Sequence, residues 1–67
     1  MKNKKLTTAR EKSGKTQKQV AEEIKISVRN YQDYEYNINI PNVLTAIKIA
    51  NALGVENLRE LWSSPKF

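Results

Sequence analysis

The residues of this chain that could do chemistry gather in residues 16–35, where polar side chains recur at helical spacing. If this stretch forms two short helices joined by a tight turn, its apolar residues share one core. The side chains left pointing outward are then Gln17, Lys18, Val28, Arg29, Gln32 and Asp33. This set offers charge and hydrogen-bonding groups rather than a nucleophile. We interpret it as the working surface of a helix-turn-helix.

The composition argues against an enzyme. None of the 67 residues is cysteine or histidine, which excludes nucleophilic or general-base catalysis by either residue. The carboxylates are scattered without metal-ligand spacing, and a body of this size has little room for a large pocket. Catalysis by carboxylates alone is the one enzymatic alternative that the composition leaves. We therefore expect no catalytic residue, no metal or other cofactor and no small-molecule substrate.

The positive charge is concentrated in the first half of the chain. Of the net charge of +5, residues 1–29 contribute +6 and residues 30–67 contribute −1. Such a field attracts an anionic polymer, although a merely soluble basic domain would carry it as well. No apolar run approaches the length of a membrane span, and no apolar segment follows the lysine-rich start, so we expect a soluble, cytoplasmic protein without membrane contact.

Capping signals divide the chain into helices. The first is expected over about residues 4–13 and ends at Gly14. The pattern Thr16-x-x-Gln19 is a capping box that opens a second helix. Lys25 falls in the turn, where positive φ is expected at a cost of about 1 kcal/mol relative to glycine. Ser27 then caps a third helix, which contains Tyr31 on its inward face.

The second half continues in the same way. Asn42 caps a fourth helix that ends at Gly54, and Asn57 opens a short fifth helix anchored by Leu58, Leu61 and Trp62. The predicted fold is therefore all-α, a compact bundle of five short helices in one domain of residues 1–67. Residues 1–5 are expected to form a basic arm and residues 63–67 a loose tail.

From Leu6 to Trp62 the chain resembles the Cro and lambda-repressor type of helix-turn-helix protein, also called XRE-like. The landmarks follow the family order: the start LTTARE, Thr16-Gln17, Val20-Ala21, Ile26-Ser27, Glu35, Pro41 and IANALGV. The resemblance implies a sequence-specific regulator of transcription, with a repressor as the favoured interpretation. It also implies that the third helix enters the major groove of double-stranded DNA and that a homodimer binds a pseudo-palindromic operator.

The resemblance also assigns roles by position. Base readout falls on Ser27, Val28, Arg29, Gln32 and Asp33, and phosphate contact on Lys15, Thr16, Gln17, Lys18, Tyr36, Asn37 and Asn39. Arginine can fork onto guanine, glutamine can pair with adenine, and aspartate can accept from cytosine. Asp33 has an alternative role, which is to orient Arg29 from four residues away. Arg10 and Glu35 are expected to form a structural ion pair.

The expected dimer interface consists of Leu44, Ile47, Leu58, Leu61 and Trp62. The chain departs from the family pattern at the turn, where Lys25 replaces glycine, and in residues 36–40, which lack lysine and arginine. Ile38 and Ile40 in that loop motivate an alternative function. In it, the same body is a protein-interaction module or antitoxin-like partner with weak DNA binding.

Overall fold

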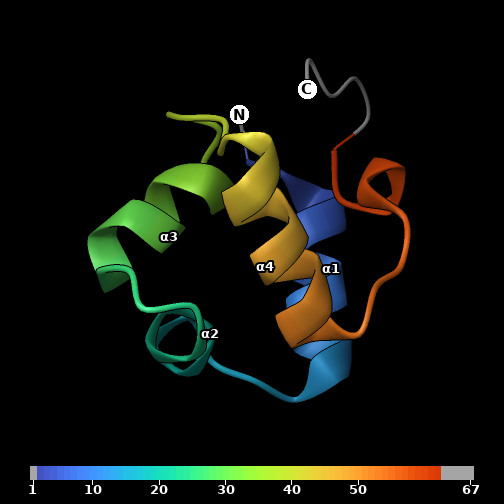
Figure 1. Cartoon of the computed structure of the whole chain (residues 1–67), viewed down its shortest axis with the longest axis horizontal. Helices are drawn as coiled ribbons and strands as arrows, with labels where there is room; N and C mark the ends of the chain where they lie inside the picture. The colour runs from blue at the N-terminus through green and yellow to red at the C-terminus, as the bar shows by residue number, and fades with distance from the viewer. Residues whose placement is uncertain (1, 63–67) are drawn as a thin grey trace.

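The computed structural model describes residues 2–62, which fold into four α-helices and one 3₁₀ turn (Figure 1). These are α1 (Lys4–Ser13), α2 (Gln17–Glu23), α3 (Val28–Glu35), α4 (Val43–Leu53) and η1 (Leu58–Glu60). The described residues form no strand, in agreement with the all-α prediction. The expected fifth α-helix is wrong in detail, because η1 is a single 3₁₀ turn. Asn57 caps it, and the backbone amides of Leu61 and Trp62 both donate to the carbonyl of Leu58 as the chain turns into the core.

Local sequence signals account for the helix boundaries. The Thr16 hydroxyl accepts from the Gln19 amide, and the Gln19 side chain accepts from the Thr16 amide at 2.8 Å, which completes the capping box. Gly54 ends α4 with φ +72°. Lys25 has φ +61°, as its place in the turn predicts. A left-handed residue there lets the chain reverse between α2 and α3 within a few residues.

The start of the chain differs from the arm expected for residues 1–5, whereas α1 begins at Lys4, in agreement with the helix expected over about residues 4–13. Asn3 caps α1, and its side-chain amide donates to the Leu61 carbonyl at 2.8 Å. Its backbone amide donates to the carbonyl of Glu35 at 2.7 Å. Lys4 and Lys5 therefore belong to α1, because one asparagine ties its beginning to α3 and to the residue after η1. Met1 and the tail predicted for residues 63–67 lie outside the described residues.

The core surrounds α4, which has α3 on one side and η1 on the other (Figure 1). Its buried apolar members are Leu6, Val20, Ala21, Ile24, Tyr31, Ala46, Ile49, Ala50, Leu53, Leu61 and Trp62. Leu61 is fully buried and Trp62 is 5% exposed. The expectation that these two form a dimer surface is therefore wrong, because they complete the core of one chain. No described helix has the length and apolarity to cross a bilayer.

Candidate nucleic-acid interface

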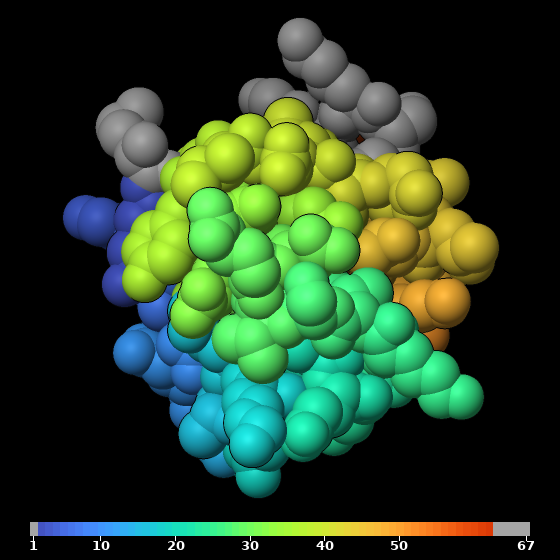
Figure 2. All heavy atoms as spheres, turned by 90° about the vertical axis from the view of Figure 1, so that its left-hand side faces the viewer, coloured from blue at the N-terminus to red at the C-terminus, as the bar shows by residue number. Residues whose placement is uncertain are grey.

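Figure 2 looks directly onto α3. The outward side chains of α3 occupy the middle of this face, with α2 below them and residues 36–42 above. The helix begins at Val28 because the Ser27 hydroxyl accepts from the Asn30 amide at 3.0 Å. Tyr31 is fully buried and fixes the opposite side of α3 against the core. The outward side of α3 is thus presented by a firmly held helix.

A buried ion pair fixes the C-terminal end of α3. Arg10 Nε lies 2.6 Å from Glu35 Oε2, and the two side chains are 15% and 0% exposed. The other carboxylate oxygen, Oε1, accepts from Gln17 Nε2 at 3.0 Å and from Thr7 Oγ1 at 3.3 Å. One carboxylate therefore joins α1, α2 and α3, so its charge is compensated and both of its oxygens have partners.

The pKa shifts follow from this arrangement. Burial alone would raise the pKa of Glu35, but the hydrogen bonds from Arg10 and Gln17 outweigh it and hold that pKa below its ordinary value. Burial opposes the charged form of Arg10 as well, and the bond to Glu35 outweighs it and raises the Arg10 pKa. The Tyr31 hydroxyl has no hydrogen bond of normal geometry among the described residues. Burial, followed by the nearby Glu35 carboxylate, raises the pKa of Tyr31.

Gln17 connects this buried pair to the surface of α3. While its amide nitrogen donates to Glu35, its amide oxygen accepts from Gln32 Nε2 at 3.2 Å. Both glutamines are half-buried. Gln32 donates one side-chain N–H to Gln17, so its second N–H and its carbonyl oxygen can bind a ligand. The structure thereby sets the orientation of the Gln32 amide before any ligand binds.

Arg29 and Asp33 form a pair on the same surface. Arg29 Nε lies 3.5 Å from Asp33 Oδ1, with Arg29 82% and Asp33 16% exposed. The second carboxylate oxygen accepts from Asn39 Nδ2 at 3.4 Å. Because both oxygens of Asp33 have a partner, this geometry matches its alternative role, which is to orient Arg29. The guanidinium edge of Arg29 beyond Nε extends into solvent and keeps donors for a ligand.

The residues expected to contact phosphate lie in different surroundings. Lys18 is exposed, and Thr16 is committed to the capping box. Lys15 departs from the expectation, because its ammonium is 2.8 Å from Glu23 and donates to the carbonyl of Ala52 at 2.6 Å. Lys15 therefore ties α2 to the end of α4, and its charge is already paired with that of Glu23.

The loop after α3 carries the rest of the expected phosphate set. Tyr36, Asn37 and Asn39 are all exposed, and Asn37 adopts φ +58°. The ammonium of Lys2 lies 6.0 Å from the centre of the Tyr36 ring, at the edge of cation–π range. Lys2 therefore brings a positive charge to a loop that has none of its own.

Two residues of this face were missed by the sequence reasoning. Asn30 is exposed in the first turn of α3. It lies about 100° from Arg29 around a helix, and Gln32 lies about 60° away on the other side, so a helical wheel would have found it. Lys2 carried no such signal, because its place beside Tyr36, in the loop after α3, is a contact between residues far apart in the sequence.

Beside this face lies an exposed apolar patch, which we define as Ile38, Ile40, Val43, Leu44 and Ile47. Their exposed fractions range from 43% for Ile47 to 65% for Ile38. Leu44 and Ile47 were expected at a dimer interface, and both are available for one. Leu58, also expected there, is half-buried against the core. The available surface thus lies on the α3–α4 loop and the first half of α4, away from η1.

Two comparisons with known proteins bear on this geometry. The family model described as helix-turn-helix matches residues 6–61. The cryptic phage CTXphi transcriptional repressor RstR of Vibrio cholerae serotype O1 is 36% identical over an alignment of 61 residues, and the alignment covers 88% of this chain. The chain spans 54% of the length of that repressor. No solved structure matches the chain.

Proposed function

Because the chain belongs to the Cro and lambda-repressor (XRE-like) family of helix-turn-helix domains, we propose that it binds double-stranded DNA sequence-specifically and regulates transcription, as a repressor. The observation that carries the proposal is the outward side of α3. There Arg29 and Gln32 are held by internal partners while each keeps hydrogen-bonding groups for a ligand. Such preorganised polar groups on a fixed helix suit the major groove.

We assign separate roles to the side chains on this face. Arg29 donates to the O6 and N7 atoms of guanine, with Asp33 holding its Nε edge, and Gln32 reads adenine. Val28 contacts a thymine methyl group, and Ser27 adds a hydroxyl beside it. Lys18, Gln17 and the exposed loop residues Tyr36, Asn37 and Asn39 contact phosphates and set the register of α3 on the duplex.

The active form is a homodimer on a pseudo-palindromic operator, with half-sites about 34 Å apart, one turn of DNA. We assign its contact to the apolar patch, in which Leu44 and Ile47 are 61% and 43% exposed. Exposed apolar side chains gathered on one side of a small domain are typical of a protein–protein contact. If the two-fold axis of the dimer runs through the patch along the direction in which α3 faces, the two copies of α3 lie on the same side of the dimer.

Selection of bound sequences from random duplex DNA tests the proposal. We expect a palindromic consensus whose half-sites repeat at one helical turn. On that site Arg29→Ala should lose about 1–3 kcal/mol and relax preference at one base position, whereas Lys18→Ala should weaken consensus and scrambled DNA alike and lower the salt dependence. Equal behaviour of the two variants on both DNAs would contradict the readout assignment.

The apolar patch also favours a second candidate, a protein-interaction module with weak DNA binding. In that case the patch is the main functional surface and α3 serves mainly as scaffold. The same selection separates the two functions, because an interaction module would return no consensus sequence.

A further inference from the structure

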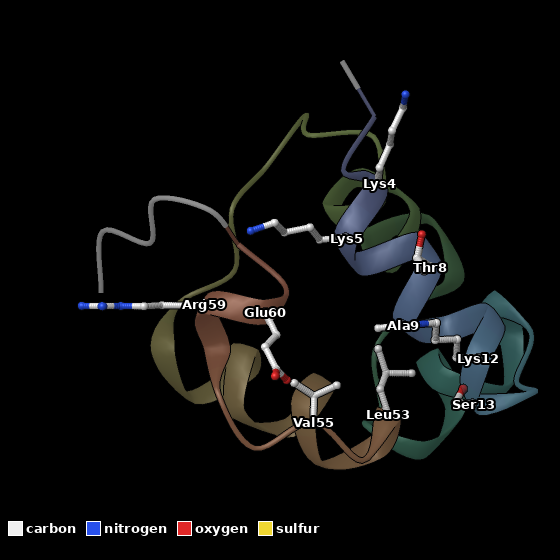
Figure 3. Close-up of a pocket in the computed structure, with 10 residues that line it drawn as sticks. All are labelled: Lys4, Lys5, Thr8, Ala9, Lys12, Ser13, Leu53, Val55, Arg59 and Glu60. Carbon is white, nitrogen blue, oxygen red and sulfur yellow. The ribbon is translucent and has the colours of Figure 1, made fainter.

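A groove on the far side of the molecule has no role in the proposed DNA contact. It is open, has a volume of about 770 Å³, and lies between α1, the end of α4 and η1 (Figure 3). The domain places η1 on the side of α4 opposite α3 (Figure 1). A ligand in the groove would therefore leave the recognition helix open to DNA.

The middle of the groove is apolar. Ala9 of α1 faces Leu53 at the end of α4, with Val55 beside them (Figure 3). Ala9 and Val55 are half-buried, and Leu53 is 7% exposed. Covering such a surface with an apolar side chain is favourable, because apolar area is removed from water. A phosphate backbone has no such side chain, so this feature does not suit nucleic acid.

The edges of the groove are basic. Lys4, Lys5, Lys12 and Arg59 line it together with one acid, Glu60. Lys5 extends from α1 toward η1, while Lys4 and Arg59 point outward at the edges (Figure 3). Among the described ion pairs, none involves any of these four basic side chains. Their charge is therefore available to an incoming anionic partner.

The geometry points to an acidic, amphipathic protein segment as the occupant of this groove. Its carboxylates would pair with the basic edge while one or two apolar side chains cover Ala9, Leu53 and Val55, which is the helix-in-groove mode of recognition. A second copy of this chain is a poor fit, because its net charge of +5 would oppose the same basic edge. The inference does not rest on DNA binding, since the groove shares no residue with the surface around α3.

The test is an NMR titration of the ¹⁵N-labelled chain with a synthetic helix-forming peptide of about 16 residues. The peptide carries leucines at i, i+3, i+4 and i+7, glutamates at about half of the remaining positions and alanines at the rest, so that it is acidic and can still form a helix. We expect amide shifts at Ala9, Leu53 and Val55. A peptide with lysines for glutamates, and one with serines for leucines, should each bind at least about tenfold more weakly. Equal binding by the leucine-free peptide would overturn the proposal, because charge alone would then explain the contact.

Charge-matched variants locate the site. Lys5→Gln/Lys12→Gln should weaken the acidic peptide about fivefold or more, while Lys25→Gln/Lys48→Gln, with the same loss of charge away from the groove, should leave its affinity unchanged. Thr8→Glu provides a second variant at an exposed groove position. This added negative charge should also weaken binding of the acidic peptide.

Duplex DNA provides the last arm of the test. Peptide and DNA should bind the chain together, since they use different faces. If the peptide instead shifted only amide signals of α3, and if DNA displaced the peptide, the peptide would be a DNA mimic. That result would overturn the groove assignment. Failure of DNA binding with intact peptide binding would count only against the proposed function.

Discussion

Replacing Arg10 by methionine tests the buried ion pair most directly. The change keeps an unbranched apolar side chain of similar reach but removes Arg10, which among the described residues is the only charged partner of the fully buried Glu35 side chain. Gln17 and Thr7 remain as neutral donors to the carboxylate. Removing one partner of a buried pair costs about 3–5 kcal/mol. Because Arg10 is 15% exposed and two donors remain, we expect the lower end, about 3 kcal/mol at pH 7.

The loss of stability in Arg10→Met should depend on pH. In the native chain the Glu35 pKa lies below its ordinary value of 4.5, so its contribution to stability is complete above that value and is lost as pH falls through the folded pKa. In Arg10→Met, burial dominates and raises the folded pKa above the unfolded one. Stability then rises as the carboxyl takes up its proton. The gap between variant and native chain should therefore be largest at pH 7 and shrink toward pH 4.

Urea unfolding followed by far-UV circular dichroism, at pH 7 and in steps down to pH 4, measures both quantities. A domain of this size has a total stability of about 3–10 kcal/mol, so about 15 °C, near maximum stability, is the suitable temperature. The double variant Arg10→Met/Glu35→Leu keeps the test decisive if the single variant unfolds. It should recover most of the loss, because both charges are gone. A gap below about 1 kcal/mol at pH 7, or one that does not change with pH, would show that Arg10 does not compensate a buried charge on Glu35.

Substitutions in the turn, at the start of α1 and in the apolar patch test separate features of the domain. Lys25→Gly should stabilise the chain by about 0.5–1 kcal/mol, because glycine relieves the positive φ at a smaller entropic cost; thermal unfolding measures it, and a loss would contradict the strain. Asn3→Ala should cost about 1–2 kcal/mol in the same assay by removing the α1 cap and the bond to Leu61, and no change would mean that neither bond matters. Leu44→Ser/Ile47→Ser should leave stability within about 0.5 kcal/mol, since both residues are exposed, yet abolish self-association in sedimentation. Dimers of unchanged affinity would place the interface elsewhere.

The parts of the fold that the sequence predicted are those governed by neighbouring residues. Thr16 and Gln19 cap α2 within one turn, and Gly54 ends α4 by its own conformation, so both boundaries could be read directly. Lys25 was placed at positive φ for the same local reason.

Contacts between distant residues could not be predicted in this way. The ammonium of Lys15 donates to the carbonyl of Ala52, which is 37 residues away in the sequence. Nothing in the sequence near Lys15 indicates that partner. Leu61 and Trp62 are large apolar residues, which are equally suited to an interface between two chains and to the core of one chain. Only the packing of η1 against α4 decides that they close the core. The Gln17–Gln32 bond depends in the same way on the angle between α2 and α3.

This bond gives the buried ion pair a consequence beyond stability. A buried pair contributes little net stability compared with apolar residues of the same volume, so the fold alone does not require Arg10 and Glu35. The carboxylate does, however, fix the amide of Gln17, which in turn fixes Gln32 on the outward side of α3. The variant Arg10→Met/Glu35→Leu separates these roles, because it removes the acceptor of Gln17 while it restores an apolar core. Near-native stability together with weaker discrimination at the base assigned to Gln32 would show that the pair orients the recognition surface. Unchanged discrimination would confine the pair to the fold.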